Sequence, residues 1–262
     1  GNFSVRMSTT GAHEFVELAK AFNQMARGVA EGKLLSRFVS EAVRTAAGDD
    51  ARGRAAEKGE FIEVSVLFAG LADFKYLLEH RSPHEVVVLM NRFLEAMSQE
   101  IRAHGGDIDK FIGEKILAVF HPTRLGGAPA AATAAVKAAE AMRRRARQLA
   151  PDLTKPLGIG IVSGPVLAGI MGTEEVRLEY TVIGDTVNLA SRLGDLAMKI
   201  SPSRDVLKST EASVGGVVLE SRTFTLLQAG PEPRTTERFQ QLHLPPIKGK
   251  TRSVDAYLVT DA

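Results

Sequence analysis

The sequence predicts an α+β fold with a ferredoxin-like βαββαβ core and extra strands, and three observations lead to this prediction. Residues 62–69 (IEVSVLFA) have the composition of a buried strand, and a long amphipathic helix follows them. Residues 107–112 and 115–120 predict an antiparallel hairpin around a glycine turn. An alanine-rich helix at 128–149 then leads into further short apolar runs. Two β-α-β units with an antiparallel hairpin are typical of this core.

The individual elements have their own local signals. Ser82-Pro83-His84-Glu85 reads as a capping box with proline at the first helical position, so a helix begins there. Its buried face is marked by apolar residues: Val86, Leu89, Met90, Phe93, Met97 and Ile101. Asp185 is the predicted cap of a later helix that extends to residue 197. The remaining short apolar runs are predicted as strands: residues 157–164, 166–172, 178–184, 241–247 and 254–259.

The composition argues against several classes of protein. The chain has 262 residues, 44% hydrophobic and 24% charged, which is enough for one large core with an accessory segment. Its net charge of +2 gives no electrostatic argument for nucleic acid or a membrane surface, and RNA binding is disfavoured because only 6% of residues are aromatic. There is no cysteine, the six histidines form no metal motif, and no run approaches 18 apolar residues.

Residues 1–45 are predicted to differ from the rest of the chain. Apolar residues recur there at the spacing of a coiled-coil seam: Phe15, Leu18, Phe22, Met25 and Val29. This pattern fits one amphipathic helix packed on the domain, and it also fits a parallel dimeric helix that carries a signal inward. Residues 46–60 are small and charged without apolar periodicity, so we expect a flexible linker. The main domain then occupies residues 61–262.

Two pairs of residues have spacings that suit a functional site. Asn188 and Arg192 are four apart and share one helix face, which suits a phosphate that gains charge during a reaction. A surface arginine with an ordinary ion pair has the same spacing. Lys110 and Glu114 flank a tight turn at Gly113, either as a cross-hairpin ion pair or facing a ligand. On spacing alone, an ordinary surface arginine and an ordinary ion pair are the favoured interpretations.

Two further segments have compositions found at phosphate sites. Residues 158–164 are rich in glycine, but they match neither a P-loop nor the GxGxxG pattern, so no phosphate role is assigned to them. Lys248 and Lys250 flank a glycine, an arrangement that suits a triphosphate tail and equally a solvated turn.

Three blocks of sequence together resemble the class III nucleotide cyclase domain of the bacterial adenylate cyclase type: HGGDIDKFIGEKILAVF, GIVSGPVLAGIMGTEEVRLEYTVIGDTVNLASRL and PIKGKTRSVDAYLV. The resemblance covers about residues 61–260. ELAKAFNQMARGVAEGKLL looks like the second helix of a HAMP linker, and LSRFVSEAVR looks like the segment that couples it to a cyclase. The resemblance implies a cytoplasmic fragment of a receptor anchored in the inner membrane by an upstream part.

The resemblance also implies a mechanism. Class III cyclases are head-to-tail dimers in which the ribose 3′-hydroxyl of ATP attacks the α-phosphate, giving 3′,5′-cyclic AMP and pyrophosphate, so they are phosphorus–oxygen lyases. Two divalent ions, Mg²⁺ or Mn²⁺, assist this step. Lys110 matches the family lysine that contacts adenine, and Thr181 matches the second base-reading residue, a pair that implies ATP rather than GTP. Asn188 and Arg192 match the pair that orients ribose and stabilises the transition state. Lys248 or Lys250 would contact the terminal phosphates.

The metal residues depart from the family pattern. Glu114 replaces the second metal aspartate and is one methylene longer, which Mg²⁺ tolerates badly. Gly70 stands where the family has the first metal aspartate, and it has no side chain to offer. Asp73, three residues further on, is a poor substitute because metal ligands need accurate placement. The sequence therefore predicts a degraded metal site.

Two functions follow from this pattern. The first is an adenylate cyclase whose activity is weakened by the degraded site. The second is a catalytically silent module that binds nucleotide or only dimerises, and relays a HAMP signal. A heterodimer joins the two, because this protomer would lend its base-reading face to an intact cyclase that supplies both metal carboxylates.

Overall fold

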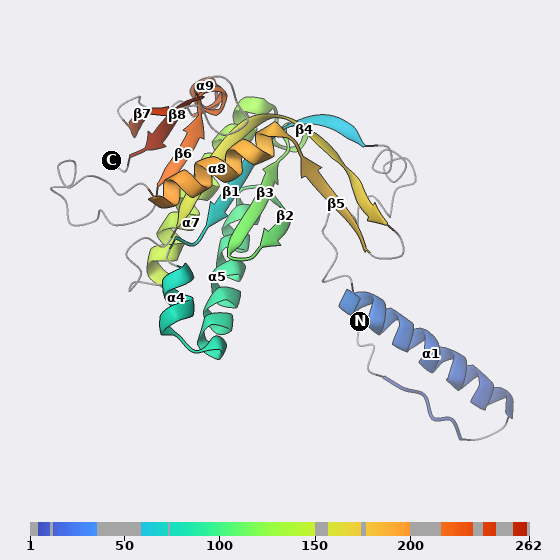
Figure 1. Ribbon diagram of the computed structural model, residues 1–262. Coiled ribbons are helices and arrows are strands. Elements are labelled where there is room, and N and C mark those ends of the chain that lie inside the picture. The colour runs from blue at the N-terminus through green and yellow to red at the C-terminus, as the bar shows by residue number, and fades with distance from the viewer. Residues whose placement is uncertain are drawn as a thin grey trace.

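The structure of the protein is a computed structural model (Figure 1). It describes residues 5–10, 13–35, 59–72, 74–149, 157–173, 177–199, 216–232, 238–244 and 254–260. The helices within these residues are α1 (His13–Leu35), α4 (Phe74–His80), α5 (Pro83–Ala103), α6 (Pro122–Leu125), α7 (Ala128–Leu149), α8 (Asp185–Lys199) and α9 (Ser221–Gln228). The strands are β1 (Glu60–Gly70), β2 (Asp107–Ile112), β3 (Lys115–Phe120), β4 (Gly158–Thr173), β5 (Arg177–Ile183), β6 (Val217–Glu220), β7 (Phe239–Leu244) and β8 (Val254–Val259). The predicted α+β class is confirmed.

The strands form one sheet in the order β2-β3-β1-β4-β6-β8-β7, with β5 paired to β4. β1 lies antiparallel between β3 and β4, whereas β6 pairs with β4 in parallel. β2 and β3 form the predicted hairpin. The runs predicted as separate strands at 157–164 and 166–172 are one continuous strand, β4, because its first part pairs with β1 and its second part extends past the sheet to pair with β5.

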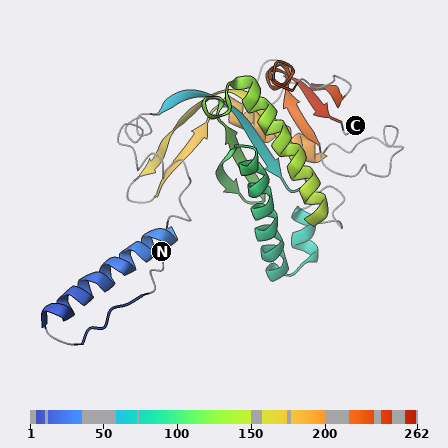
Figure 2. The same ribbon diagram turned by 180° about the vertical axis from the view of Figure 1, so that it is seen from behind.

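Helices cover both faces of the sheet, with α5 and α7 on one face and α8 on the other (Figures 1 and 2). Successive residues of β1 point to opposite faces of the sheet. Because helices cover both faces, both sets of side chains are buried along most of the strand. Val66 and Phe68 pack in the cluster under α8, whereas Leu67 and Ala69 pack in the larger cluster under α5 and α7. The result is a sheet with an apolar core on each side.

The predicted start of α5 is confirmed in detail. The Ser82 hydroxyl accepts a hydrogen bond from the Glu85 backbone N–H at 3.4 Å, and Glu85 Oε2 accepts from the Ser82 N–H at 2.9 Å. These reciprocal bonds satisfy N–H groups that the helix itself leaves unpaired. The buried face contains Val86, Met90, Phe93, Ala96, Met97, Ser98 and Ile101, so five of the six predicted positions are fully buried and Leu89 is partly buried. Asp185 lies in the first turn of α8 and is not its cap.

The glycines of β4 allow α8 to lie directly on the strand. A Cβ atom at Gly160 would meet the Ala190 carbonyl oxygen and would lie 2.8 Å from Leu193 Cβ. A Cβ at Gly194 of α8 would lie 3.0 Å from the Phe68 carbonyl oxygen. Contacts as short as those at Gly160 essentially do not occur for real side chains, so this position needs glycine, and a side chain at Gly194 would force the backbone of β1 to shift by a few tenths of an ångström. The glycine-rich segment 158–164 therefore has a packing role.

The helix α1 has an apolar seam that is exposed within the described residues. Side chains of the predicted seam at Phe15, Leu18, Met25 and Val29 face solvent, and only Phe22 is half-buried. Two hydrogen bonds join the Asn23 side chain to the backbone of Met7, at 2.8 and 3.0 Å, so the segment 5–10 lies beside this helix (Figure 1). None of the described helices is long and apolar enough to cross a membrane. The predicted linker 46–60 falls mostly outside the described residues.

Candidate functional site

A β-bulge in β2 sets the geometry of the first part of the site. The pairing of β2 with β3 passes from Ile108 opposite Ala118 to Lys110 opposite Leu117, so Asp109 is left as the extra residue. A bulge bends the strand and re-aims the side chain of the inserted residue. The Asp109 carboxylate is consequently aimed away from β3 and toward β5.

The Asp109 carboxylate accepts two hydrogen bonds from β5. Thr181 Oγ1 donates to Oδ2 at 2.9 Å, and the Val182 backbone N–H donates to Oδ1 at 3.3 Å. Lys110 Nζ lies 3.6 Å from Oδ2 of the same carboxylate and 3.2 Å from Oε1 of Glu179. The two predicted base-reading residues, Lys110 and Thr181, are therefore brought together, with Asp109 between them.

Burial is the largest influence on the Asp109 carboxyl. Its side chain is 5% exposed, and loss of water raises the pKa of Asp109 above its ordinary value, although Thr181 and Lys110 act to lower it. The Lys110 side chain is 26% exposed, whereas Thr181 as a whole residue is 5% exposed. The site thus offers an ammonium donor at its surface and a hydroxyl that is largely covered.

Asp109 and Glu179 were missed in the sequence. Glu179 is two residues before Thr181 in an extended strand, so it lies on the same side of β5, and this spacing was available as a signal. Asp109 gives no such signal, because regular alternation along β2 would place it and Lys110 on opposite sides. Only the bulge overrides that alternation.

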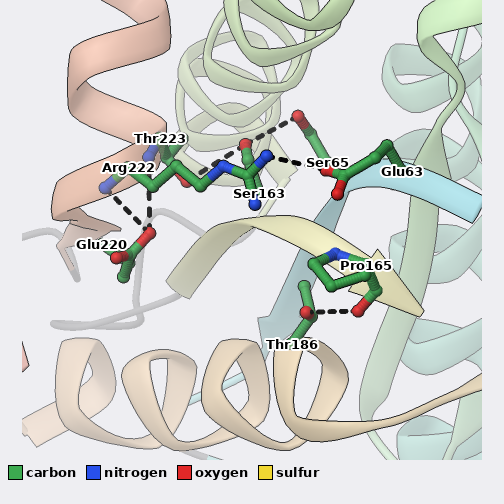
Figure 3. A network of polar contacts seen from close by, with 8 residues as sticks. All are labelled: Glu63, Ser65, Ser163, Pro165, Thr186, Glu220, Arg222 and Thr223. Atoms are coloured by element: carbon green, nitrogen blue, oxygen red, sulfur yellow. Dashed lines mark hydrogen bonds and ion pairs between the residues drawn. The ribbon is translucent and has the colours of Figure 1, made fainter.

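The second part of the site is the beginning of α8, which carries Asn188 and Arg192 one helical turn apart. Asn188 is exposed and Arg192 is half-buried. The Thr186 hydroxyl donates to the Pro165 carbonyl oxygen at 2.7 Å and so fixes the first turn of this helix to β4 (Figure 3). Nearby, the buried Ser163 hydroxyl contacts those of Ser65 at 2.8 Å and Thr223 at 3.1 Å. These bonds hold β1, β4 and α9 together on the face of the sheet opposite α8.

The third part of the site is the end of the sheet that holds Gly70 and Glu114. Gly70 of β1 pairs directly with Lys115 of β3, and Glu114 precedes Lys115 in the hairpin turn. The two positions that the resemblance assigns to metal ligands therefore lie at the same end of the sheet. A Cβ at Gly70 would lie 3.2 Å from both Lys115 Cγ and Met198 Sδ. A side chain at residue 70 would therefore begin in tight contact with Lys115 and Met198, which would have to shift by a few tenths of an ångström.

Lys115 brings a positive charge to this end of the sheet. Its Nζ lies 2.6 Å from Asp195 Oδ1 on α8 and 5.8 Å from the Phe68 ring centroid. Among the described residues, no group of three or more histidine, aspartate or glutamate side chains is placed to hold a metal ion. One glutamate beside a lysine does not fit the two-aspartate site that the resemblance implies. Asp73, Lys248 and Lys250 lie outside the described residues.

The chain is similar to known proteins over most of its length. Residues 56–229 match the family model described as the adenylate and guanylate cyclase catalytic domain. An uncharacterized protein of Mycobacterium tuberculosis is 36% identical over 257 residues, which cover 94% of this chain and 43% of that protein. The chain therefore spans less than half the length of this relative.

Two crystal structures are similar at more than a quarter sequence identity. The adenylyl cyclase CyaB from P. aeruginosa is 28% identical with a TM-score of 0.63, over 78% of this chain and 96% of that one. The guanylyl cyclase Cya2 is 27% identical with a TM-score of 0.57, over 77% of this chain and 93% of that one. Because one is named for the adenine and the other for the guanine nucleotide, overall similarity does not indicate which base this chain would read.

Proposed function

The chain belongs to the adenylate and guanylate cyclase catalytic domain family, and we propose that it is an adenylate cyclase-type signalling domain with a weakened metal site. The proposed reaction converts ATP to 3′,5′-cyclic AMP and pyrophosphate at a dimer interface. One observation carries the choice of ATP, namely the meeting of Lys110 and Thr181 beside Asp109. An ammonium group can donate to N1 of adenine, and a hydroxyl oxygen can accept from its 6-amino group.

Asn188 and Arg192 supply the electrostatic part of the proposed mechanism. Their place at the beginning of α8 lets both side chains reach one ligand across a helical turn. Asn188 would hold the ribose, and Arg192 would donate to the phosphate oxygens that gain charge as the α-phosphate is attacked. Removing a donor of this kind typically costs about 10²- to 10³-fold in rate.

The metal end is the weak part of the proposed site. Cyclases of this family use divalent metal ions, which acidify the attacking hydroxyl and hold the triphosphate. Here Gly70 offers no ligand, Glu114 offers one carboxylate, and Lys115 places a cation beside them. Because metal ligands carry much of the catalysis, we expect Mg²⁺- or Mn²⁺-dependent turnover at least about 10²-fold below that of an intact site.

The same geometry favours a second candidate, a heterodimer with an intact cyclase. Cyclase domains of this family dimerise and bind nucleotides. This protomer retains Lys110, Thr181, Asn188 and Arg192, whereas the residues it lacks are those a partner protomer would supply. A silent module that only relays a signal would also need to dimerise. The exposed apolar seam of α1 supports helix pairing, whether the chain acts in a heterodimeric cyclase or as a silent module.

The N-terminal part extends the proposal beyond the cyclase domain. Because the relative from Mycobacterium tuberculosis is more than twice as long as this chain, we infer that the chain is part of a longer signalling protein. Residues 1–45 would be the second helix and coupling segment of a HAMP linker, and residues 46–60 a linker to the catalytic domain at 61–262. The cyclase domain would then lie in the cytoplasm, with an inner-membrane anchor upstream.

The test is cyclic AMP formation by the purified chain with ATP and either Mg²⁺ or Mn²⁺, alone and mixed with an intact class III cyclase. Slow turnover alone supports the weakened homodimer. Turnover that rises only on mixing with a cyclase that keeps both metal aspartates but whose own Asn and Arg are substituted supports the heterodimer. If the mixture stays inert while the two chains demonstrably pair, the heterodimer is rejected. Absence of ATP binding in either state would reject the whole proposal.

A further inference from the structure

We propose that Asp109 is the positioning residue that makes this site select adenine over guanine, an inference that rests on the proposed function. It acts by accepting a hydrogen bond from the Thr181 hydroxyl, so that the threonine oxygen has only lone pairs left for a ligand. Asp109 itself need not touch the nucleotide.

The hydrogen-bond directions around Asp109 support this role. A threonine hydroxyl has one proton and two lone pairs, and by itself it can serve a ligand as donor or acceptor. Here the proton has a carboxylate acceptor at 2.9 Å, whereas the alternative acceptor, the Val182 carbonyl oxygen, lies at 3.4 Å. Bonds to an ionised carboxylate are also stronger than bonds to a neutral carbonyl. Thr181 is therefore committed to donate toward Asp109.

This commitment gives the site one donor and one acceptor. Lys110 is always a donor, and its ammonium is held between Asp109 and Glu179. Adenine presents an acceptor at N1 and a donor at its 6-amino group, which match in the order Lys110, Thr181. Guanine in the same pose presents a donor at N1 and an acceptor at O6, so both contacts are mismatched. Specificity built on such mismatches is large because each leaves a desolvated polar group unpaired.

The substitution Asp109→Asn tests this role because the structure predicts how the amide will lie. The Val182 N–H donates to Oδ1, so the amide oxygen must remain at that position and the amide NH₂ falls beside Thr181 Oγ1. The NH₂ group then donates to the threonine oxygen, and the threonine hydroxyl becomes free to donate its hydrogen bond to the ligand. We expect the preference for ATP over GTP to fall roughly tenfold or more.

The measurement is the dissociation constant of ATP and of GTP for the full chain, obtained by displacement of a fluorescent ATP analogue. Asp107→Asn is the matched control, because Asp107 lies on the same strand but pairs with Arg124 at 2.7 Å, and its selectivity should equal that of the wild type. In a Thr181→Val background, Asp109→Asn should leave the ATP:GTP ratio unchanged. If Asp109 had a merely structural role, Asp109→Asn would weaken the binding of ATP and GTP together. The ATP:GTP ratio would then stay unchanged in the wild-type background and in the Thr181→Val background.

The outcomes separate this inference from the proposed function. If the wild type prefers ATP and Asp109→Asn keeps that preference, the role of Asp109 is rejected while the proposed function stands. If the wild type binds neither nucleotide, both are rejected. If Asp109→Asn fails to fold, the pH dependence of the ATP:GTP ratio of the wild type tests the inference instead. Lys110, Glu179 and Tyr180 are the other titratable groups near the Asp109 carboxyl. The ratio must fall on acidification in the wild type but not in Thr181→Val, and a ratio independent of pH overturns the inference.

Discussion

Gly70 and Lys115 face each other across β1 and β3, and the lysine side chain passes within 3.2 Å of where a Cβ at Gly70 would lie. The ammonium is held at 2.6 Å by Asp195. The place where the family carries a metal aspartate is therefore bordered by a fixed cation. Two changes, not one, separate this site from a metal site, because the ligand is missing and a positive charge stands beside its place.

Restoring the aspartates is expected to be insufficient while Lys115 remains. In Gly70→Asp with Glu114→Asp, the new carboxylate would pair with the Lys115 ammonium and so compete with the metal ion. Adding Lys115→Leu should raise cyclic AMP formation by roughly tenfold or more, measured with Mn²⁺ and saturating ATP. Lys137→Leu is a matched control, because Lys137 also pairs with a carboxylate, Glu232, at 2.7 Å. Equal rates for the double and triple variants would contradict this expectation.

Arg192 is expected to act on turnover and hardly on ATP affinity. In the triple variant with restored aspartates and Lys115→Leu, Arg192→Ala should lower the turnover number by about 10²- to 10³-fold, because the contact of Arg192 would form only as the phosphate gains charge. The dissociation constant of ATP should change by less than about threefold. Arg145→Ala on α7 is the control, since Arg145 is exposed and bonds Gln148. A purely structural role of Arg192 would instead show as a lower melting temperature.

Gly160→Ala is expected to destabilise the domain. Its Cβ would meet backbone atoms of α8, which cannot swing away as a long side chain can. Overpacking of this kind costs about 1–3 kcal/mol in the free energy of unfolding. Gly28→Ala in α1 is the opposite control, because no atom lies within 4 Å of the added Cβ and alanine favours a helix. Urea unfolding followed by circular dichroism measures the stability of both variants. An unchanged midpoint for Gly160→Ala would show that α8 can move outward.

Asp109 should make stability fall as the pH rises. Burial raises the pKa of this carboxyl in the folded protein, so the protonated form is favoured there relative to the unfolded chain. Its stabilising contribution is complete below the ordinary aspartate pKa and is lost as the pH passes through the raised value. The wild type should therefore lose stability relative to Asp109→Asn by about 1.4 kcal/mol per unit of pKa shift. Urea unfolding of both chains from about pH 4 upward measures this difference. A relative gain for the wild type would mean that the bonds from Thr181 and Val182 outweigh burial.

Much of the fold was predictable from local patterns. The capping box of Ser82 and Glu85 and the hairpin around Gly113 depend on neighbours in the sequence, so residue types alone indicated them. The joining of two predicted strands into β4 was not visible, because it depends on pairing with both β1 and β5. The glycines at 158–164 were recognised as unlike a phosphate loop, but their packing role needed the position of α8.

Residue identity and order are enough to indicate the family, the α+β class and the missing side chain at Gly70. How the surviving residues meet depends on the tertiary structure. Lys110 and Thr181 are 71 positions apart in the chain, and a one-residue bulge at Asp109 brings them together by turning a carboxylate toward β5. The pairing of Gly70 with Lys115 likewise follows from strand register, a long-range property that no local spacing encodes.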